Sequence, residues 1–182
     1  MDLTKPIRRI VTGNDASGRS RIIEDGESPS VRTLPERPGY RVTNLWATDS
    51  APANIDGPDL VTGLKGVLPP KNGSVLRIID IPPEPKDPAE RERAMKASFG
   101  KLFADAHHAP KPGQHPGMHK TSTVDYAIML SGELVAIMDE EEVTMRAGDV
   151  LIQRGTNHGW SNRSDKPARI AFILLDAADD AP

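Results

Sequence analysis

The sequence contains no cysteine among its 182 residues. This absence excludes disulfides, thiolate nucleophiles and every zinc or iron–sulfur site that is built from cysteine ligands. Any metal ion would therefore be held by histidine, aspartate, glutamate or other oxygen donors. Aromatic residues are also scarce, at 4% of the chain, which argues against a surface that binds nucleic acid by stacking its bases.

An excess of one charge and a long apolar run are missing as well. The chain has 23 Lys and Arg against 26 Asp and Glu, a formal net charge of −3, with no long basic stretch of the kind that marks a nucleic-acid site. The longest clear apolar run is Ile170–Leu175, whereas a membrane-spanning helix needs about 20 residues. The start, MDLTKPIRRIVTG, lacks the apolar core of a signal peptide. We therefore expect a cytoplasmic protein with no nucleic-acid or membrane partner.

The length predicts one structural domain with an extension. Proline is abundant, with 17 residues, and it clusters in the first half, where it favours loops and short edge strands. We expect residues 1–74 to form an N-terminal β extension with loops. This extension should begin with a hairpin, because the strand-prone runs Ile7–Val11 and Arg19–Ile23 flank the turn residues 14–18.

One helix is expected, from about residue 88 to residue 106. Asp87 can cap its N-terminus, Pro88 suits the first helical position and Glu90 completes a box-like start. The apolar residues that follow fall on one helical face; they are Met95, Phe99, Leu102, Phe103 and Ala106. The sequence therefore predicts a helix that covers one side of a sheet.

Short strand-prone runs separated by turn residues make up much of the remaining sequence. Runs of this length and spacing are typical of an antiparallel barrel or sandwich. They are Arg41–Thr48, Val75–Ile81, Val124–Leu130, Glu133–Met138, Val143–Met145, Val150–Gln153 and Ala168–Leu175. We expect residues 75–182 to form a barrel that carries the helix as an insertion.

The stretch GQHPGMHKTSTVDYAIMLSG carries polar residues at a distinctive spacing. It begins at Gly113, which is followed by five residues and then His119. Thr121 stands two residues later, Asp125 follows after three more residues, and Gly132 comes after a further six.

A second stretch, GDVLIQRGTNHGWSN, follows at Gly148. It places Gln153, Gly155, His158 and Asn162 at a second regular spacing. Together the two stretches resemble the two signature motifs of the cupin superfamily. The resemblance extends, with flanking strands, over roughly residues 75–177.

This resemblance implies an all-β fold: a cupin-like antiparallel β-barrel, or jelly roll, with an N-terminal β extension and one covering helix. The sequence departs from the family pattern at two places. Thr121 stands where the first motif has a second histidine, and Gln153 stands where the second motif usually has proline. The gap from Gly148 to Gln153 is also one residue shorter than the pattern.

The alternation of residues in the first stretch predicts the same site independently of this resemblance. If the segment is extended, one side of the sheet carries His115, His119, Thr121, Thr123 and Asp125. The inward face of a small barrel is closed to bulk water. Burying imidazoles and a carboxylate there is costly unless they bind a partner that replaces their contacts with water. We predict that His119, Asp125 and His158 hold a divalent metal ion, Fe(II), Mn(II) or Zn(II), as a two-histidine, one-carboxylate set with open positions.

Other arrangements stay open at this point. His115 shares the inward parity and is the alternative ligand in place of the histidine that is missing at Thr121. Without a metal ion, His119 would be a hydrogen-bonded barrel histidine, Asp125 a turn or surface acid, and His158 a loop residue.

Arg154 is the candidate for contact with a charged substrate. It follows a predicted strand near the mouth of the barrel, where its planar fork could clamp a carboxylate or an enolate. The competing interpretation is a surface ion pair with Asp149 or Asp165.

The sequence therefore predicts a metal-dependent enzyme that acts on a small oxygenated molecule, such as a hydroxy-carbonyl, diketone or phenolic compound. With Fe(II) the site would support a dioxygenase reaction. With Zn(II) or Mn(II) it would act as a Lewis acid in a lyase, isomerase or decarboxylase. The alternative is a non-catalytic small-molecule-binding cupin. Proteins of this kind often pair through N-terminal strands, so we expect a homodimer.

Overall fold

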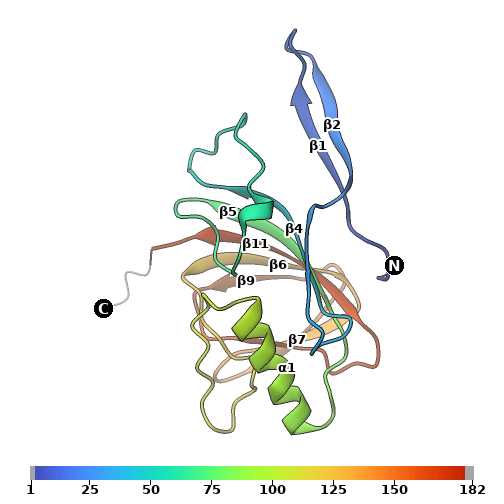
Figure 1. Cartoon of the computed structure of the whole chain (residues 1–182). Coiled ribbons are helices and arrows are strands. Elements are labelled where there is room, and N and C mark those ends of the chain that lie inside the picture. Colours follow the sequence, from blue (N-terminus) through green and yellow to red (C-terminus); the bar gives the residue numbers. More distant parts are fainter. Residues whose placement is uncertain (1–2, 179–182) are drawn as a thin grey trace.

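The chain folds mainly into β-strands, and the computed structural model describes residues 3–178 (Figure 1). Within these residues there is one α-helix, α1 (Pro88–Lys101), and one 3₁₀ turn, η1 (Val61–Gly63). The strands are β1 (Arg8–Asn14), β2 (Ser20–Glu27), β3 (Ser30–Thr33), β4 (Arg41–Thr48), β5 (Ser74–Ile81), β6 (Thr123–Ser131), β7 (Glu133–Ile137), β8 (Glu142–Arg146), β9 (Val150–Arg154), β10 (Gly159–Ser161) and β11 (Ala168–Asp176).

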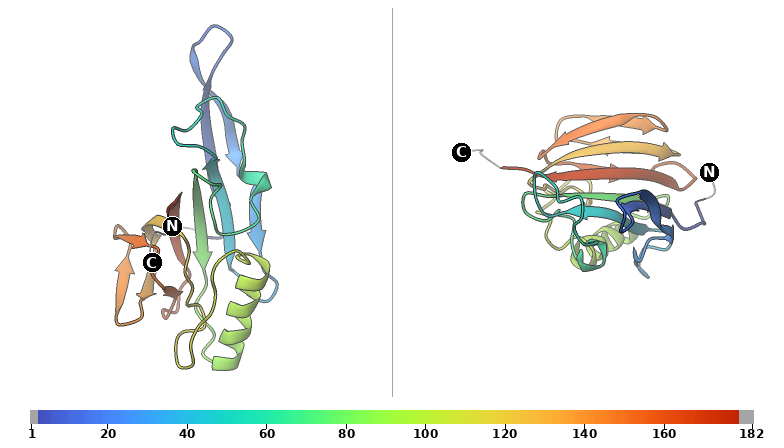
Figure 2. Two further views of the ribbon diagram at one scale, coloured as in Figure 1. Left: turned by 90° about the vertical axis from the view of Figure 1, so that its left-hand side faces the viewer. Right: turned by 90° about the horizontal axis from the view of Figure 1, so that it is seen from above.

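Two antiparallel sheets share one hydrophobic core (Figure 2). The larger sheet has the strand order β3-β4-β5-β11-β6-β9, and the smaller has the order β10-β7-β8. Alternate side chains of each strand point into the core, as Val75, Ile79 and Ile81 of β5 do. Leu134 of β7 and Phe172 of β11 belong to the same core, so the two sheets close over it. The predicted all-β fold is confirmed.

Helix α1 lies against one end of this core (Figure 1). Its start agrees with the sequence, because the Asp87 side chain accepts a hydrogen bond from the Glu90 amide at 2.7 Å and Pro88 takes the first turn. The helix ends at Lys101, earlier than residue 106. The chain then turns, but Leu102 and Phe103 remain buried. The apolar pattern that predicted the helix therefore extends beyond the last helical residue. Within residues 3–178 no helix is both long and apolar enough to cross a membrane.

The strands expected from alternation and turn residues all form, and their bounds move by at most four residues. Gly132 explains the tight β6–β7 turn: it has a φ of 76°, and a Cβ atom there would lie 3.0 Å from the Cα atom of Ala168. Two short strands, β3 and β10, were not expected.

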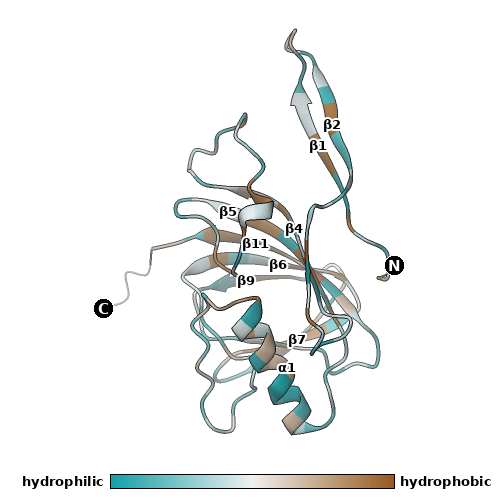
Figure 3. Cartoon of the chain, viewed as in Figure 1, coloured by the Kyte–Doolittle hydropathy of each residue, from teal (hydrophilic) through white to brown (hydrophobic). Residues whose placement is uncertain are grey.

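The predicted N-terminal hairpin forms as β1 and β2, and it projects away from the rest of the chain (Figures 1 and 2). Within the described residues its strands pair only with each other, so the hairpin completes neither of the larger sheets. Arg9 fixes its base by binding Glu24 and Asp59. Hydrophobic and hydrophilic residues alternate in patches along the hairpin (Figure 3). The side chains of Ile22 and Ile23 are exposed there.

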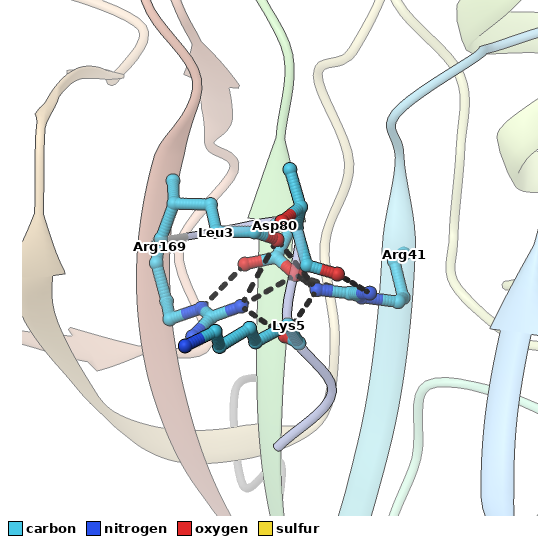
Figure 4. A network of polar contacts seen from close by, with 6 residues as sticks. Leu3, Lys5, Arg41, Asp80 and Arg169 are labelled. Atoms are coloured by element: carbon cyan, nitrogen blue, oxygen red, sulfur yellow. Dashed lines mark hydrogen bonds and ion pairs between the residues drawn. The ribbon is translucent and has the colours of Figure 1, made fainter. Parts of the chain in front are cut away.

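Below the hairpin, a buried charged cluster ties the N-terminal segment to three strands (Figure 4). Asp80 of β5 accepts hydrogen bonds from Arg41 of β4 and from Arg169 of β11. The same arginines donate to the backbone carbonyl oxygens of Leu3 and Lys5. In this cluster one carboxylate and the backbone carbonyl groups of Leu3, Thr4 and Lys5 accept hydrogen bonds from the two arginines.

Candidate functional site

A cavity of about 70 Å³ lies inside the core, between the larger sheet, helix α1 and the loop that carries His158. Its polar lining comes from His119, Thr121, Asp125, His158, Arg37 and Arg77. Aromatic side chains form much of the remaining wall, among them Phe99, Trp160 and Phe172. A small pocket with few polar groups among aromatic walls is the usual form of a ligand site.

His119 and His158 lie side by side on this cavity. Their backbones pair, with N–O distances of 2.8 and 2.9 Å in the two directions, and their ring centroids are 4.3 Å apart. Each ring Nδ1 lies 2.9 Å from a backbone carbonyl oxygen, that of Gly117 for His119 and that of Thr156 for His158. Because a carbonyl oxygen only accepts, both Nδ1 atoms carry the proton and both Nε2 atoms are left as acceptors.

Both imidazoles are neutral near pH 7. Burial, together with a smaller effect of the neighbouring His158 ring, lowers the pKa of His119 to about 3. Burial also lowers the pKa of His158. Neutral imidazoles whose Nδ1 protons are fixed by carbonyl groups present their Nε2 lone pairs in a defined direction, as metal-binding histidines do.

Asp125 faces the same cavity from β6. Its strand neighbour across the sheet is Gln153 of β9, and both side chains are buried as the predicted parity requires. Burial raises the pKa of Asp125 to about 6, against the opposing effects of a hydrogen bond from Thr123 and the charge of Arg77. Its Oδ1 atom is buried with no hydrogen-bond partner in the described part of the chain. This oxygen is therefore available to a ligand.

The structure does not assemble the predicted three-ligand metal site. Among residues 3–178 no three histidine or carboxylate side chains lie close enough together to hold a metal ion. Thr121 supplies no imidazole, and its hydroxyl lies 2.8 Å from that of Thr123. The donor set therefore amounts to the His119 and His158 pair, with Asp125 farther along the cavity.

His115, the alternative ligand, is committed elsewhere. Its Nε2 atom lies 2.9 Å from Glu84, and its Nδ1 atom accepts a hydrogen bond from the Gly117 amide. Burial alone would raise the pKa of Glu84, but hydrogen bonds from His115 and Ser161 hold it below its usual value. Both nitrogens of His115 are used, so His115 does not replace the missing histidine.

Arg154 does not reach the cavity, and its predicted contact with substrate has no support in this structure. Gln153 points inward, so the next residue of β9 points outward, and the Arg154 side chain is exposed on the outer face. The arginines of the cavity are instead Arg37 and Arg77. The alternation of β5 indicates that Arg77 is buried, because Val75, Arg77 and Ile79 share one face of the strand and the two neighbours are apolar.

Arg37 stacks on the ring of Tyr40, with its guanidinium carbon 4.1 Å from the ring centroid. Its Nη1 atom donates to the Ser98 hydroxyl at 3.4 Å, and burial lowers its pKa. Nothing in the local sequence identified this residue, because it comes from a proline-rich loop that reaches the cavity only in the folded chain.

Comparisons with known proteins find a matching family model and several similar proteins. Residues 107–174 match the family model described as "Cupin domain". The "Cupin-domain-containing oxidoreductase fogC" of Aspergillus ruber is 29% identical over 97% of this chain and 75% of its own length. The "Phomopsin biosynthesis cluster protein C'" of Diaporthe leptostromiformis is 29% identical over 93% of this chain and 78% of its own. A solved ethanolamine utilization protein from Salmonella typhimurium has a TM-score of 0.43 at 10% identity, over 96% of this chain and 99% of that one.

Proposed function

Because this chain carries a cupin domain, we propose that it is an oxidoreductase that binds a small oxygenated organic molecule in the cavity between its sheets. One relative along nearly the whole chain is named as a cupin-domain-containing oxidoreductase, and another is named as a biosynthesis cluster protein. Both names support an enzyme that acts on small molecules. The observation that carries the proposal is that His119, His158 and Asp125 line one cavity with acceptor atoms left free.

The three residues suit different roles. A histidine with a pKa of about 3 is a weak base, so His119 would orient a substrate hydroxyl by accepting its hydrogen bond. His158 would do the same from the adjacent position, 4.3 Å away between ring centroids. Asp125, with a pKa of about 6, lies closer to neutral pH and is the better acceptor for a substrate proton.

An oxidation also needs an electron acceptor, and the chain has no cysteine to provide one. A redox metal ion with dioxygen would supply that chemistry, and His119 and His158 are the residues through which this chain would bind it. The side chains in residues 3–178 do not fit a three-ligand set, however. The roles given above to the histidines and to Asp125 therefore do not pass through a metal ion.

The test is elemental analysis of protein purified without chelator, combined with an oxygen-uptake screen on phenolic and diketone compounds. We expect turnover that falls at least about 10-fold in His158→Ala and in Asp125→Asn, because each removes an acceptor atom from the cavity. His107→Ala, which removes an exposed imidazole, is the matched control and should keep wild-type turnover. Oxidation that survives in both cavity variants would contradict the proposal.

The alternative is a non-catalytic barrel that binds a small molecule. Thr121, at the place of the second motif histidine, favours it, because its hydroxyl is bound to Thr123 and offers no strong metal ligand. Ligands that raise the melting temperature without being converted, in protein that contains no metal, would support this alternative. Turnover without oxygen, in protein that holds a redox-inert metal ion, would favour lyase or isomerase chemistry.

A further inference from the structure

Arg77 is a buried charge that the protein satisfies only in part. Its side chain is 1% exposed and lines the cavity from the middle of β5. Its Nη1 atom donates to the Gly66 carbonyl oxygen at 3.2 Å. Its Nε and Nη2 atoms are buried and have no hydrogen-bond partner among the residues that the structure describes. These two atoms form one edge of the guanidinium, the edge that binds a carboxylate with two parallel hydrogen bonds.

A second buried arginine in the same sheet shows what this edge normally binds. Arg169 is 5% exposed, and its Nε and Nη2 atoms donate to the two carboxylate oxygens of Asp80 at 2.6 and 3.0 Å (Figure 4). Arg77 is more deeply buried than Arg169 and has no such carboxylate. Because a buried charge is costly unless it is paired, an anion bound at the unpartnered edge of Arg77 would stabilise it.

The nearest carboxylates do not fill that place. The charge of Asp105 acts on Arg77, but its two oxygens accept hydrogen bonds from the backbone amides of Val67 and Leu68 at 2.7 and 3.0 Å. Asp125 also acts on Arg77 through its charge, yet no hydrogen bond joins the two side chains.

The charge balance of the cavity favours an anion as well. Arg37 and Arg77 line it, together with two neutral histidines and one carboxylate, Asp125. Burial lowers the pKa of Arg77 to about 10, so the side chain is still a cation at neutral pH. Counted over its lining side chains alone, the cavity thus has one positive charge in excess. Phe172 is the strand neighbour of Arg77, and Trp160 packs edge-on against Phe172 with centroids 5.2 Å apart.

We propose that Arg77 determines the substrate class of this site: its Nε–Nη2 edge binds the carboxylate of a small organic acid whose apolar body lies against Phe172 and Trp160. The proposal rests on the proposed binding of a small molecule in this cavity and adds what that molecule must carry. Arg77 acts here in recognition, and the acceptor atoms of the histidines and Asp125 remain for the reacting part of the substrate.

The experiment measures binding, without turnover, by titrating the whole protein with propionate and benzoate at constant ionic strength. Benzamide, which has the shape of benzoate without its charge, is the neutral probe. We expect wild-type protein to bind at least one of the two acids and not benzamide. Arg77→Lys keeps the charge but loses the planar fork, so affinity should fall about 10- to 100-fold. Arg77→Met should abolish binding, and Arg154→Met, which changes an exposed arginine, should leave it unchanged.

Thermal stability of the ligand-free variants gives a second readout. Arg77→Met removes an unpaired buried charge, so its melting temperature should equal or exceed that of the wild type. Arg169→Met leaves Asp80 without its buried partner and should lower the melting temperature. A fall in Arg77→Met as large as that in Arg169→Met would overturn the proposal, because Arg77 would then be a structural residue.

Failure of this inference is distinguishable from failure of the proposed function. Acid binding that is absent in the wild type, or unchanged in Arg77→Lys and Arg77→Met, overturns the role of Arg77 even if neutral phenols or diketones are oxidised. Arg77-dependent acid binding in a protein that oxidises no compound supports the role of Arg77 and contradicts the oxidoreductase.

Discussion

Replacing Asp80 by asparagine tests whether the buried charged cluster holds the N-terminal segment and three strands together. Asp80 is 4% exposed and accepts four hydrogen bonds from Arg41 and Arg169, with lengths between 2.6 and 3.0 Å. Asparagine keeps the shape of the side chain but not its charge. Arg169, which is equally buried, would then lose the carboxylate that accepts two of its hydrogen bonds.

Removing one partner of a buried ion pair costs about 3–5 kcal/mol, and we expect the free energy of unfolding to fall by that amount. Most of the loss comes from Arg169, because the Arg41 side chain is 20% exposed and keeps some contact with water. For a protein of this length about 2–4 °C are lost per kcal/mol, so the melting temperature should fall by roughly 6–20 °C.

Urea unfolding followed by circular dichroism measures this change, with an unchanged m value as the sign that only stability has moved. Asp25→Asn is the matched control, because its ion pair with Arg8 is exposed and the midpoint should hardly move. Adding Arg169→Met to Asp80→Asn should recover part of the loss, since it removes the buried charge that has lost its carboxylate. A loss below about 1 kcal/mol in Asp80→Asn, or no recovery in the double variant, would refute the reasoning.

Three further predictions follow from the site and the hairpin. The pKa of His119 is about 3 in the folded protein and about 6.5 in the unfolded chain. Between these two pH values the unfolded state binds more protons than the folded state, so the free energy of unfolding should fall as the pH is lowered from 7 to 4. Urea titrations should show a smaller fall in His119→Gln, and an equal fall would contradict this origin. Thr121→His should raise the metal content toward one equivalent in elemental analysis, because a third imidazole joins His119 and His158; unchanged content would argue against a metal site. Deleting residues 1–24 should leave the two-sheet core folded. If the hairpin is exchanged between subunits, light scattering of the truncated protein should show monomer or aggregate instead of a dimer. A truncated protein that stays a stable dimer would contradict that exchange.

Much of the fold could be predicted because its strands are bounded by local signals. The β6–β7 turn depends on the glycine at position 132, whose positive φ is a local requirement, and the helix start depends on Asp87 and Pro88. Strands β3 and β10 escaped prediction because each is very short, and β10 in addition pairs with residues more than twenty positions earlier in the sequence. Their hydrogen bonds are decided by tertiary contacts, which local alternation does not encode.

The cavity residues that the sequence indicated come from the two motif stretches, whereas those supplied by other parts of the chain were missed. The spacing of His119, Asp125 and His158 placed all three on one cavity. The hydrogen bond from His115 to Glu84 depends on a residue more than thirty positions earlier, so parity alone mistook His115 for a cavity residue. The apolar alternation of β5 marks Arg77 as a buried cation, but no motif or local pattern indicates that its side chain lines the cavity.

The Asp80 cluster also bears on how this protein can diverge. Its arginines hold residues 3 and 5 through backbone carbonyl oxygens, which every amino acid possesses. Substitutions at these two positions can therefore accumulate without breaking the contact. A one-residue insertion or deletion between position 5 and Arg8, where β1 begins, would instead move both carbonyl groups away from the arginines. In a lineage of such proteins, the length of this connection should persist while its side chains vary.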